Sequence, residues 1–140
     1  MLKIITLALS LFIGTPLMSK ESCPLELKSQ KLCAHISWKL GPQYGAYSTA
    51  IVKYWKKGAP KTQLTDPEKT IEVYPWMVMK GMEHGGSDIE IKKLGLGTYE
   101  VSKILFLKMM GHWELRFKNE GKNPKKDYLA KLRIPLTKNK

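Results

Sequence analysis

Hydrophobic and polar residues alternate along most of this 140-residue chain, the pattern of half-buried β-strands. In the segment 31–38, for example, the side chains of Leu32, Ala34, Ile36 and Trp38 share one face. The later segments with this period are rich in β-branched and aromatic residues, which favour strands. The predicted strands are 31–38, 47–55, 71–79, 88–94, 98–107, 112–117 and 128–134.

Turn residues separate these segments. Gly95-Leu96-Gly97 predicts a tight hairpin, and Gly121 and Pro124 mark another turn. Seven short strands in about 100 residues are typical of an all-β, immunoglobulin-like two-sheet sandwich. We therefore expect one domain over residues 31–136, preceded by an N-terminal segment, 20–30.

The strand directions predict which loops meet. If successive strands reverse, 31–38, 71–79 and 98–107 run the same way, so the loops 80–87 and 108–111 converge at one end. In the strand 112–117 the alternation predicts three residues facing inward, Trp113, Leu115 and Phe117, and three facing outward, His112, Glu114 and Arg116.

The N-terminus has the organisation of a secretory signal peptide. Lys3 precedes an apolar run, 4–13, and Gly14 and Pro16 then break the pattern. We expect residues 1–19 to be the signal and the protein to be periplasmic or extracellular. A retained anchor is the alternative, although the run is shorter than the ~20 apolar residues that span a bilayer.

The charge is strongly positive, with 24 Lys and Arg against 12 Asp and Glu, a net charge of +12. For an exported protein this favours an anionic membrane surface, a cell-wall polymer or an acidic partner over nucleic acid. The lysines are spread along the chain, so a solvated basic surface is the simpler interpretation.

Cys23 and Cys33 are the only cysteines. In an oxidising compartment they predict a disulfide that joins the N-terminal segment to the first strand. The alternative is a thiolate metal ligand at Cys33, beside His35.

The methionines are the most informative residues of the chain. All five that follow the predicted signal lie in two clusters, 77–84 and 109–112, and each cluster ends in a histidine. Thioether sulfur and imidazole nitrogen form a soft ligand set that favours Cu(I). The candidate ligands are Met79, Met82, His84, Met110 and His112.

Each of these residues also has a simpler interpretation. Methionines in a strand commonly fill gaps in a core, which is the favoured role of Met77. Strand parity turns Met110 outward and Met109 inward. His112 is either a ligand or a solvated imidazole, and Glu83 is a candidate to orient a histidine ligand.

The stretch from Pro75-Trp76-Met77 to Met82-Glu83-His84-Gly85 resembles the first half of the YtkA-like domain. The second half resembles Gly97-Thr98-Tyr99, then Phe106 and Met109-Met110-Gly111-His112-Trp113. The domain is similar to the periplasmic part of FixH-type proteins, which are linked to copper handling and oxidase assembly. The resemblance covers residues 70–118. It implies an extracytoplasmic immunoglobulin-like sandwich and an envelope partner that donates or accepts metal.

No motif of catalysis accompanies these features: there is no His-Glu-x-x-His, nucleophile elbow or phosphate-binding loop. We therefore expect no enzymatic activity. The two main hypotheses are an exported Cu(I) carrier, buffer or assembly factor, and a metal-free envelope module whose Met- and Trp-rich rim contacts a partner protein. A third, weaker hypothesis is a basic adhesin-like module that contacts anionic surfaces and depends strongly on salt.

Overall fold

The structure of the chain, a computed structural model, describes residues 22–136. The predicted signal peptide, 1–19, lies outside these residues. Within the described range there are nine strands and one short 3-10 helix: β1 (Leu25–Leu27), η1 (Lys28–Gln30), β2 (Leu32–Leu40), β3 (Tyr47–Lys56), β4 (Ile71–Met79), β5 (Met82–Gly85), β6 (Glu90–Gly95), β7 (Thr98–Leu105), β8 (His112–Asn119) and β9 (Tyr128–Ile134).

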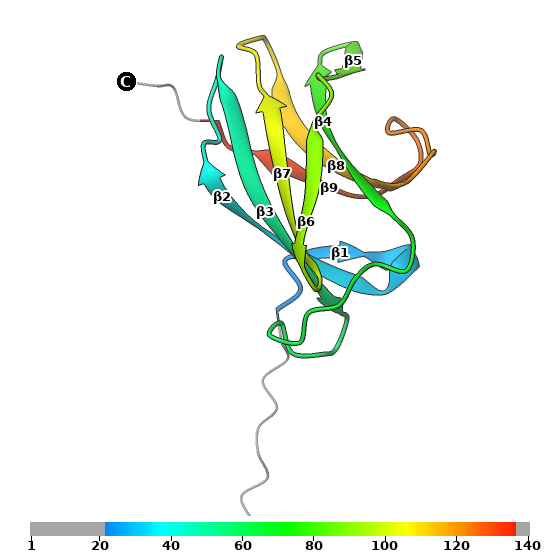
Figure 1. The fold of residues 1–140 in the computed structure, drawn as a ribbon. Coiled ribbons are helices and arrows are strands. Elements are labelled where there is room, and N and C mark those ends of the chain that lie inside the picture. The colour runs from blue at the N-terminus through cyan, green and yellow to red at the C-terminus, as the bar shows by residue number, and fades with distance from the viewer. Residues whose placement is uncertain (1–21, 137–140) are drawn as a thin grey trace, which may run out of the picture.

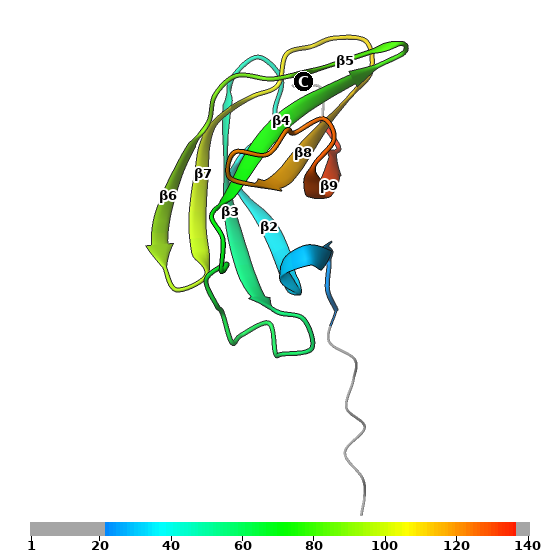
Figure 2. The ribbon, with the colours of Figure 1, turned by 90° about the vertical axis from the view of Figure 1, so that its right-hand side faces the viewer.

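The strands form two antiparallel sheets that face each other (Figures 1 and 2). One sheet has the order β1-β2-β3-β7-β6, and the other has the order β5-β4-β8-β9. The strands β2-β3-β7-β6 and β4-β8-β9 reproduce the ABED and CFG sheets of an immunoglobulin domain, to which β1 and β5 are added at the edges. The predicted all-β, immunoglobulin-like sandwich is confirmed.

The seven predicted strands are all present. β4 and β9 have the predicted bounds, and the other five differ by a few residues at their ends. Each inner face supplies the core that the alternation predicts, including fully buried Val52, Val101 and Leu115. Toward one end, the ring of Phe106 packs edge-on against Trp113 at 5.5 Å and against Trp38 at 6.2 Å.

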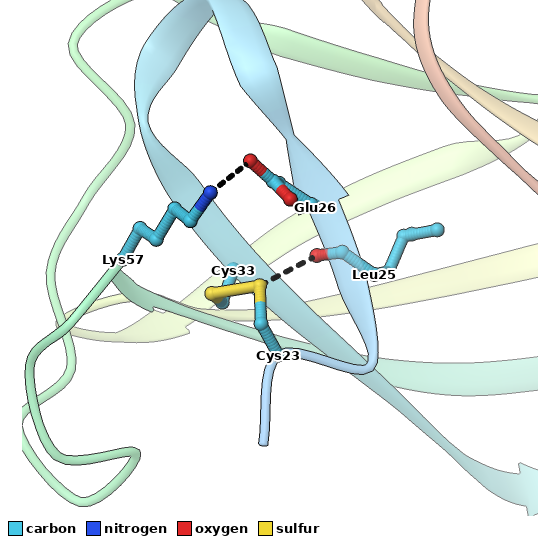
Figure 3. Close-up of a disulfide and its surroundings, with 5 residues drawn as sticks. All are labelled: Cys23, Leu25, Glu26, Cys33 and Lys57. Carbon is cyan, nitrogen blue, oxygen red and sulfur yellow. Dashed lines mark hydrogen bonds and ion pairs between the residues drawn. A yellow bond between two sulfur atoms is a disulfide. The ribbon is translucent and has the colours of Figure 1, made fainter. Parts of the chain in front are cut away.

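The predicted disulfide is present. Cys23 and Cys33 are bonded with an S–S distance of 2.04 Å and a Cα–Cα distance of 5.2 Å (Figure 3). The bond joins the segment before β1 to β2, and an ion pair of 2.5 Å between Lys57 and Glu26 lies nearby. Because the sulfur of Cys33 is bonded, it is not the thiolate ligand of the alternative interpretation.

The N-terminal segment contributes to the sandwich itself. β1 pairs with β2, with Leu27 opposite Leu32, and the side chain of Leu27 is completely buried. The sheet therefore begins before residue 31, where the sequence places the start of the domain.

One end of the sandwich gathers three connections. β2, β4 and β7 all finish there, and the β2–β3 loop, the β4–β5 hairpin and the β7–β8 loop lie together at the top of Figure 1. The backbone confirms the closeness, because Val78 near the end of β4 pairs with His112 at the start of β8. The two methionine clusters therefore converge, as the strand directions predict.

Candidate metal site at the end of the sandwich

The first methionine cluster forms a β-hairpin. The expected loop 80–87 is wrong in its middle, at residues 82–85, where β5 runs back along β4 after a turn of two residues, Lys80 and Gly81. Gly81 has a φ of +75°, a conformation that glycine adopts without a steric penalty. The hairpin pairs Met79 with Met82 and Met77 with His84.

A proline limits the hairpin. The carbonyl of Pro75 accepts a hydrogen bond of 2.8 Å from the N–H of Gly86, so Pro75 presents its edge to β5 and not to β8. Its missing N–H therefore leaves no gap in the pairing of β4 with β8. The pairing ends beside this proline, so β5 is confined to the four residues Met82–Gly85.

The register places the donor atoms of the hairpin on one face. Residues directly opposite in an antiparallel pair share a face, and so do residues two apart in a strand. Met79, Met82 and His84 therefore lie on the same face of the hairpin, which is also the face of Met77. Opposite side chains such as those of Met79 and Met82 have Cβ atoms about 5 Å apart, close enough for both thioethers to reach one ion.

Burial separates packing from available donors. Met77 is only 1% exposed and belongs to the core, the role favoured from the sequence. Met79 is half-buried and packs against that core, whereas Met82 is 59% exposed and His84 is exposed. The side chains on this face thus range from buried Met77 through half-buried Met79 to exposed Met82 and His84.

The imidazole of His84 contacts the backbone of the next residue. Its Nδ1 lies 2.9 Å from the carbonyl oxygen of Gly85. A carbonyl can only accept a hydrogen bond, so Nδ1 carries the proton and the lone pair of the neutral ring is on Nε2. Nε2 is therefore the atom that can bind a metal.

The second cluster reaches the hairpin through Gly111. This residue has a φ of +119°, and a Cβ atom built on it would lie 2.2 Å from the carbonyl oxygen of Val78 and 3.1 Å from Cγ of Met79. The loop thus packs tightly against the end of β4. Met110 is 86% exposed and Met109 is 43% exposed, so the expectation that Met109 turns inward is wrong. The tight bend at Gly111 breaks the strand alternation on which that expectation rests.

His112 lies on the other face of the sheet. It is opposite Val78, one residue out of phase with Met77 and Met79, and its Nε2 lies 3.1 Å from a carboxylate oxygen of Glu114. The sequence-predicted set is therefore divided: Met79, Met82 and His84 share a face, the Met110 loop packs beside them, and His112 projects from the opposite side.

The outer face of β8 is charged but not exposed. The alternation of the strand is as predicted, yet Glu114 and Arg116 are both buried. The guanidinium of Arg116 lies 4.8 Å from the ring centre of Trp76 on one side and 4.8 Å from that of Tyr128 on the other. These two rings cover the face that the sequence predicts to point outward.

Glu83 belongs to this outer cluster. Its carboxylate accepts a hydrogen bond of 2.7 Å from the indole N–H of Trp76 and one of 3.1 Å from Arg116. The sequence suggested that Glu83 orients a histidine ligand, but its carboxylate has these two other partners. Glu83 instead joins β5 to β4 and β8 on the face of the hairpin opposite to Met79, Met82 and His84.

The electrostatics of the cluster keep both carboxylates ionised. The hydrogen bond from Trp76 lowers the pKa of Glu83 most, and the charge of Arg116 adds to it against the opposing effect of burial. Burial alone would raise the pKa of Glu114, but hydrogen bonds from His112 and Arg116 outweigh it and hold that pKa below its ordinary value. Arg116 is thus a buried cation with two carboxylate partners.

Other ligand types do not gather in the described part of the chain. Among residues 22–136, no group of three or more His, Cys, Asp and Glu side chains is placed to hold a metal ion. The thioethers of the hairpin are a different class of ligand. Within the same range, no helix has the length and apolar character needed to cross a membrane.

Comparison with known proteins adds no relative. No family model, no curated protein and no solved structure matches this chain.

Two residues that position the candidate ligands are not identified from the sequence. Trp76 and Arg116 both donate hydrogen bonds to Glu83 of β5, but neither is a metal-ligand type, so a pattern of ligand residues does not include them. One feature of the sequence pointed to them: Glu114 and Arg116 are opposite charges on the outward face of the same strand, and aromatic side chains often cover the arginine of such a pair. Which aromatic rings supply the cover follows only from the pairing of β4 and β9 with β8.

Proposed function

We propose that this protein is an exported copper-binding protein that holds Cu(I) at the β4–β5 hairpin and exchanges it with a partner in the cell envelope. The observation that carries the proposal is the shared face of Met79, Met82 and His84 across a two-residue turn. Met110, from the adjoining loop, completes the set. His112 is the predicted ligand with the least support, because it faces the other way and pairs with Glu114.

The chemistry of the set favours a soft monovalent ion. Three thioethers and one neutral imidazole carry no negative charge, so they suit Cu(I) and are poor ligands for Mg²⁺ or Ca²⁺. The outer donors are exposed, which allows a second protein to approach a bound ion directly. Such a site suits a carrier, buffer or assembly factor better than a catalyst, and we propose no enzymatic activity.

The proposed location rests on the signal-like N-terminus and on the disulfide, which is compatible with an oxidising compartment. The resemblance of residues 70–118 to YtkA-like domains agrees with this location and with a partner in oxidase assembly.

Competition for Cu(I) tests the proposal. The protein is titrated anaerobically against a chromophoric Cu(I) chelator, together with the double variant Met82→Leu, His84→Ala and the control His35→Ala. His35 is an exposed histidine of β2, outside the candidate set. We expect one equivalent of Cu(I) in the parent and the control. In the double variant the affinity should fall by more than the roughly 100-fold that loss of an outer-shell partner can cause.

Two results would overturn this proposal. A parent protein that takes no copper from the chelator would favour the metal-free interaction module. A double variant that binds as tightly as the parent would move the site away from the hairpin. Circular dichroism of each variant separates loss of ligands from loss of fold.

A further inference from the structure

Exposed apolar side chains gather at the end of the sandwich that carries the hairpin. Each is at least 43% exposed, and together they form what we call the apolar rim: Leu40, Tyr47, Met82, Leu107, Met109 and Met110. Single exposed apolar residues are ordinary on a protein surface, but a cluster of six at one end indicates an interaction surface.

The strand register confirms that the rim is one region. Tyr47 at the start of β3 pairs with Leu105 at the end of β7, two residues before Leu107. Leu40, at the end of β2, pairs with Thr49, close to the same end. Met82 and the Met110 loop adjoin them through the end of β4.

Lysines accompany the rim. Three lysines are exposed: Lys39 and Lys108 are next to rim residues in the sequence, and Lys80 is in the hairpin turn. Among the described residues, Lys80 and Lys108 form no ion pair, whereas Lys39 pairs with Glu100 at 2.9 Å. The nearby carboxylate of Glu83 is already bound by Arg116. This end of a protein with a net charge of +12 is therefore both apolar and cationic.

We propose that the apolar rim docks on the surface of an anionic phospholipid bilayer. The apolar side chains project from separate loops and strand ends, so each can enter the headgroup region without a matching pocket. Lys80 and Lys108 then face the lipid phosphates, where each cation adds about fivefold to the affinity. Met82 and Met110 are also proposed Cu(I) ligands, but the other four rim residues and the lysines lie outside that set, so the proposal does not require bound copper.

Vesicle binding tests the proposal with matched variants of the full chain. Sedimentation is measured with vesicles of mixed phosphatidylglycerol and phosphatidylcholine and with vesicles of phosphatidylcholine alone. The rim variant is Leu40→Gln, Leu107→Gln, and the charge variant is Lys80→Gln, Lys108→Gln. The control is Leu94→Gln, Leu96→Gln, because these leucines, 50% and 63% exposed, are similar in exposure to Leu40 and Leu107 but precede β7, at the opposite end of the sandwich.

We expect the parent and the control to bind anionic vesicles more tightly than neutral ones, and salt to weaken that binding. The rim variant should bind about tenfold more weakly, and the charge variant about 25-fold more weakly. Residues 1–21 are common to all variants, so differences between variants report on the rim. Equal binding by all variants, or no preference for anionic vesicles, would overturn the proposal and leave the rim to a protein partner.

Hydrogen exchange of the unmodified protein provides a second readout that does not depend on a variant folding. Anionic vesicles should slow amide exchange in residues 107–111 and leave residues 94–97 unchanged. Protection of 94–97 alone, or of neither segment, would contradict the proposal. Copper affinity measured without vesicles should be the same in the rim variant and the parent, so failure of one proposal is distinguishable from failure of the other.

Discussion

The indole N–H of Trp76 donates a hydrogen bond of 2.7 Å to the carboxylate of Glu83, and this bond joins β4 to β5 on the outer face of the sheet. On the opposite face of the same hairpin lie Met79, Met82 and His84. One face therefore holds the hairpin in place while the other presents the candidate ligands. An edge strand of four residues has little packing of its own, so these outer contacts decide how well the ligands are positioned.

Replacing Glu83 should loosen the hairpin without removing a ligand. The variant Glu83→Ala loses the hydrogen bonds to Trp76 and Arg116, and bonds to charged groups contribute about 1.5–3 kcal/mol each. Amide exchange in Met82–Gly85 should accelerate at least about tenfold, and the affinity for Cu(I) should fall. The exposed residue Glu120 supplies the control, Glu120→Ala. Unchanged exchange in β5 would show that the outer contacts do not hold it.

Removing the buried cation should destabilise the whole sandwich. In Arg116→Gln, the carboxylates of Glu83 and Glu114 lose their shared partner, and breaking a buried ion pair from one side costs about 3–5 kcal/mol. Urea unfolding measures this as a loss in the free energy of unfolding. The variant Arg133→Gln, at an exposed position of β9, should change it by no more than about 0.5 kcal/mol. Equal effects in the two variants would contradict the role given to Arg116.

The sequence predicts the sheets better than their edges. The bounds of β4 (Ile71–Met79) and β9 (Tyr128–Ile134) are recovered in full from the alternation of the sequence and from its β-branched and aromatic residues. β5 contains Gly85 and follows Gly81, which makes it look like a loop, and its strand conformation depends on contacts with Trp76 and Arg116. Local pattern contains no information about such contacts.

Gly111 should not tolerate a side chain. Its φ of +119° is unfavourable for other residues, and a Cβ atom there would overlap the carbonyl of Val78. We expect Gly111→Ala to lower the free energy of unfolding by about 1–3 kcal/mol. Gly95→Ala is the matched control, because a Cβ atom at Gly95 meets nothing within 4 Å. A Gly111→Ala protein as stable as the parent would show that the β7–β8 loop is free to move from β4.

The carboxylate of Asp66 should make stability sensitive to acid. Hydrogen bonds from Lys93 at 2.6 Å, from the backbone N–H of Gly97 and from the hydroxyl of Tyr99 lower the pKa of Asp66 to about 2. An unfolded aspartate titrates near pH 3.9, so the folded state binds fewer protons between these values. The stabilisation is complete above about pH 4 and is lost as the pH falls through about 2.

The variant Asp66→Asn isolates this contribution. It should be less stable than the parent near neutral pH, and the difference in urea midpoint should shrink as the pH falls toward about 2. In Asp127→Asn, at an exposed position, the difference from the parent should stay small throughout. A pH-independent difference for Asp66→Asn would mean that its charge is not the source of the stabilisation.

The candidate site is only partly predictable from the sequence. The convergence of the two clusters follows from strand direction, and Val78 opposite His112 confirms it. The division between His84 and His112 depends on the register of β5 and β8 against β4, because a shift of one residue reverses the face of a side chain. No pattern within either cluster encodes that register.

NMR of the candidate ligands tests the proposed Cu(I) site most directly. The methyl groups of the methionines are labelled with carbon-13, and their NMR signals and those of the histidine rings are followed during anaerobic addition of Cu(I). We expect the Met79, Met82 and Met110 methyls and the His84 ring to shift together up to one equivalent, while buried Met77 and the ring of His35 stay in place. Unmoved signals from Met79, Met82 and His84 in the presence of Cu(I) would contradict the proposed site.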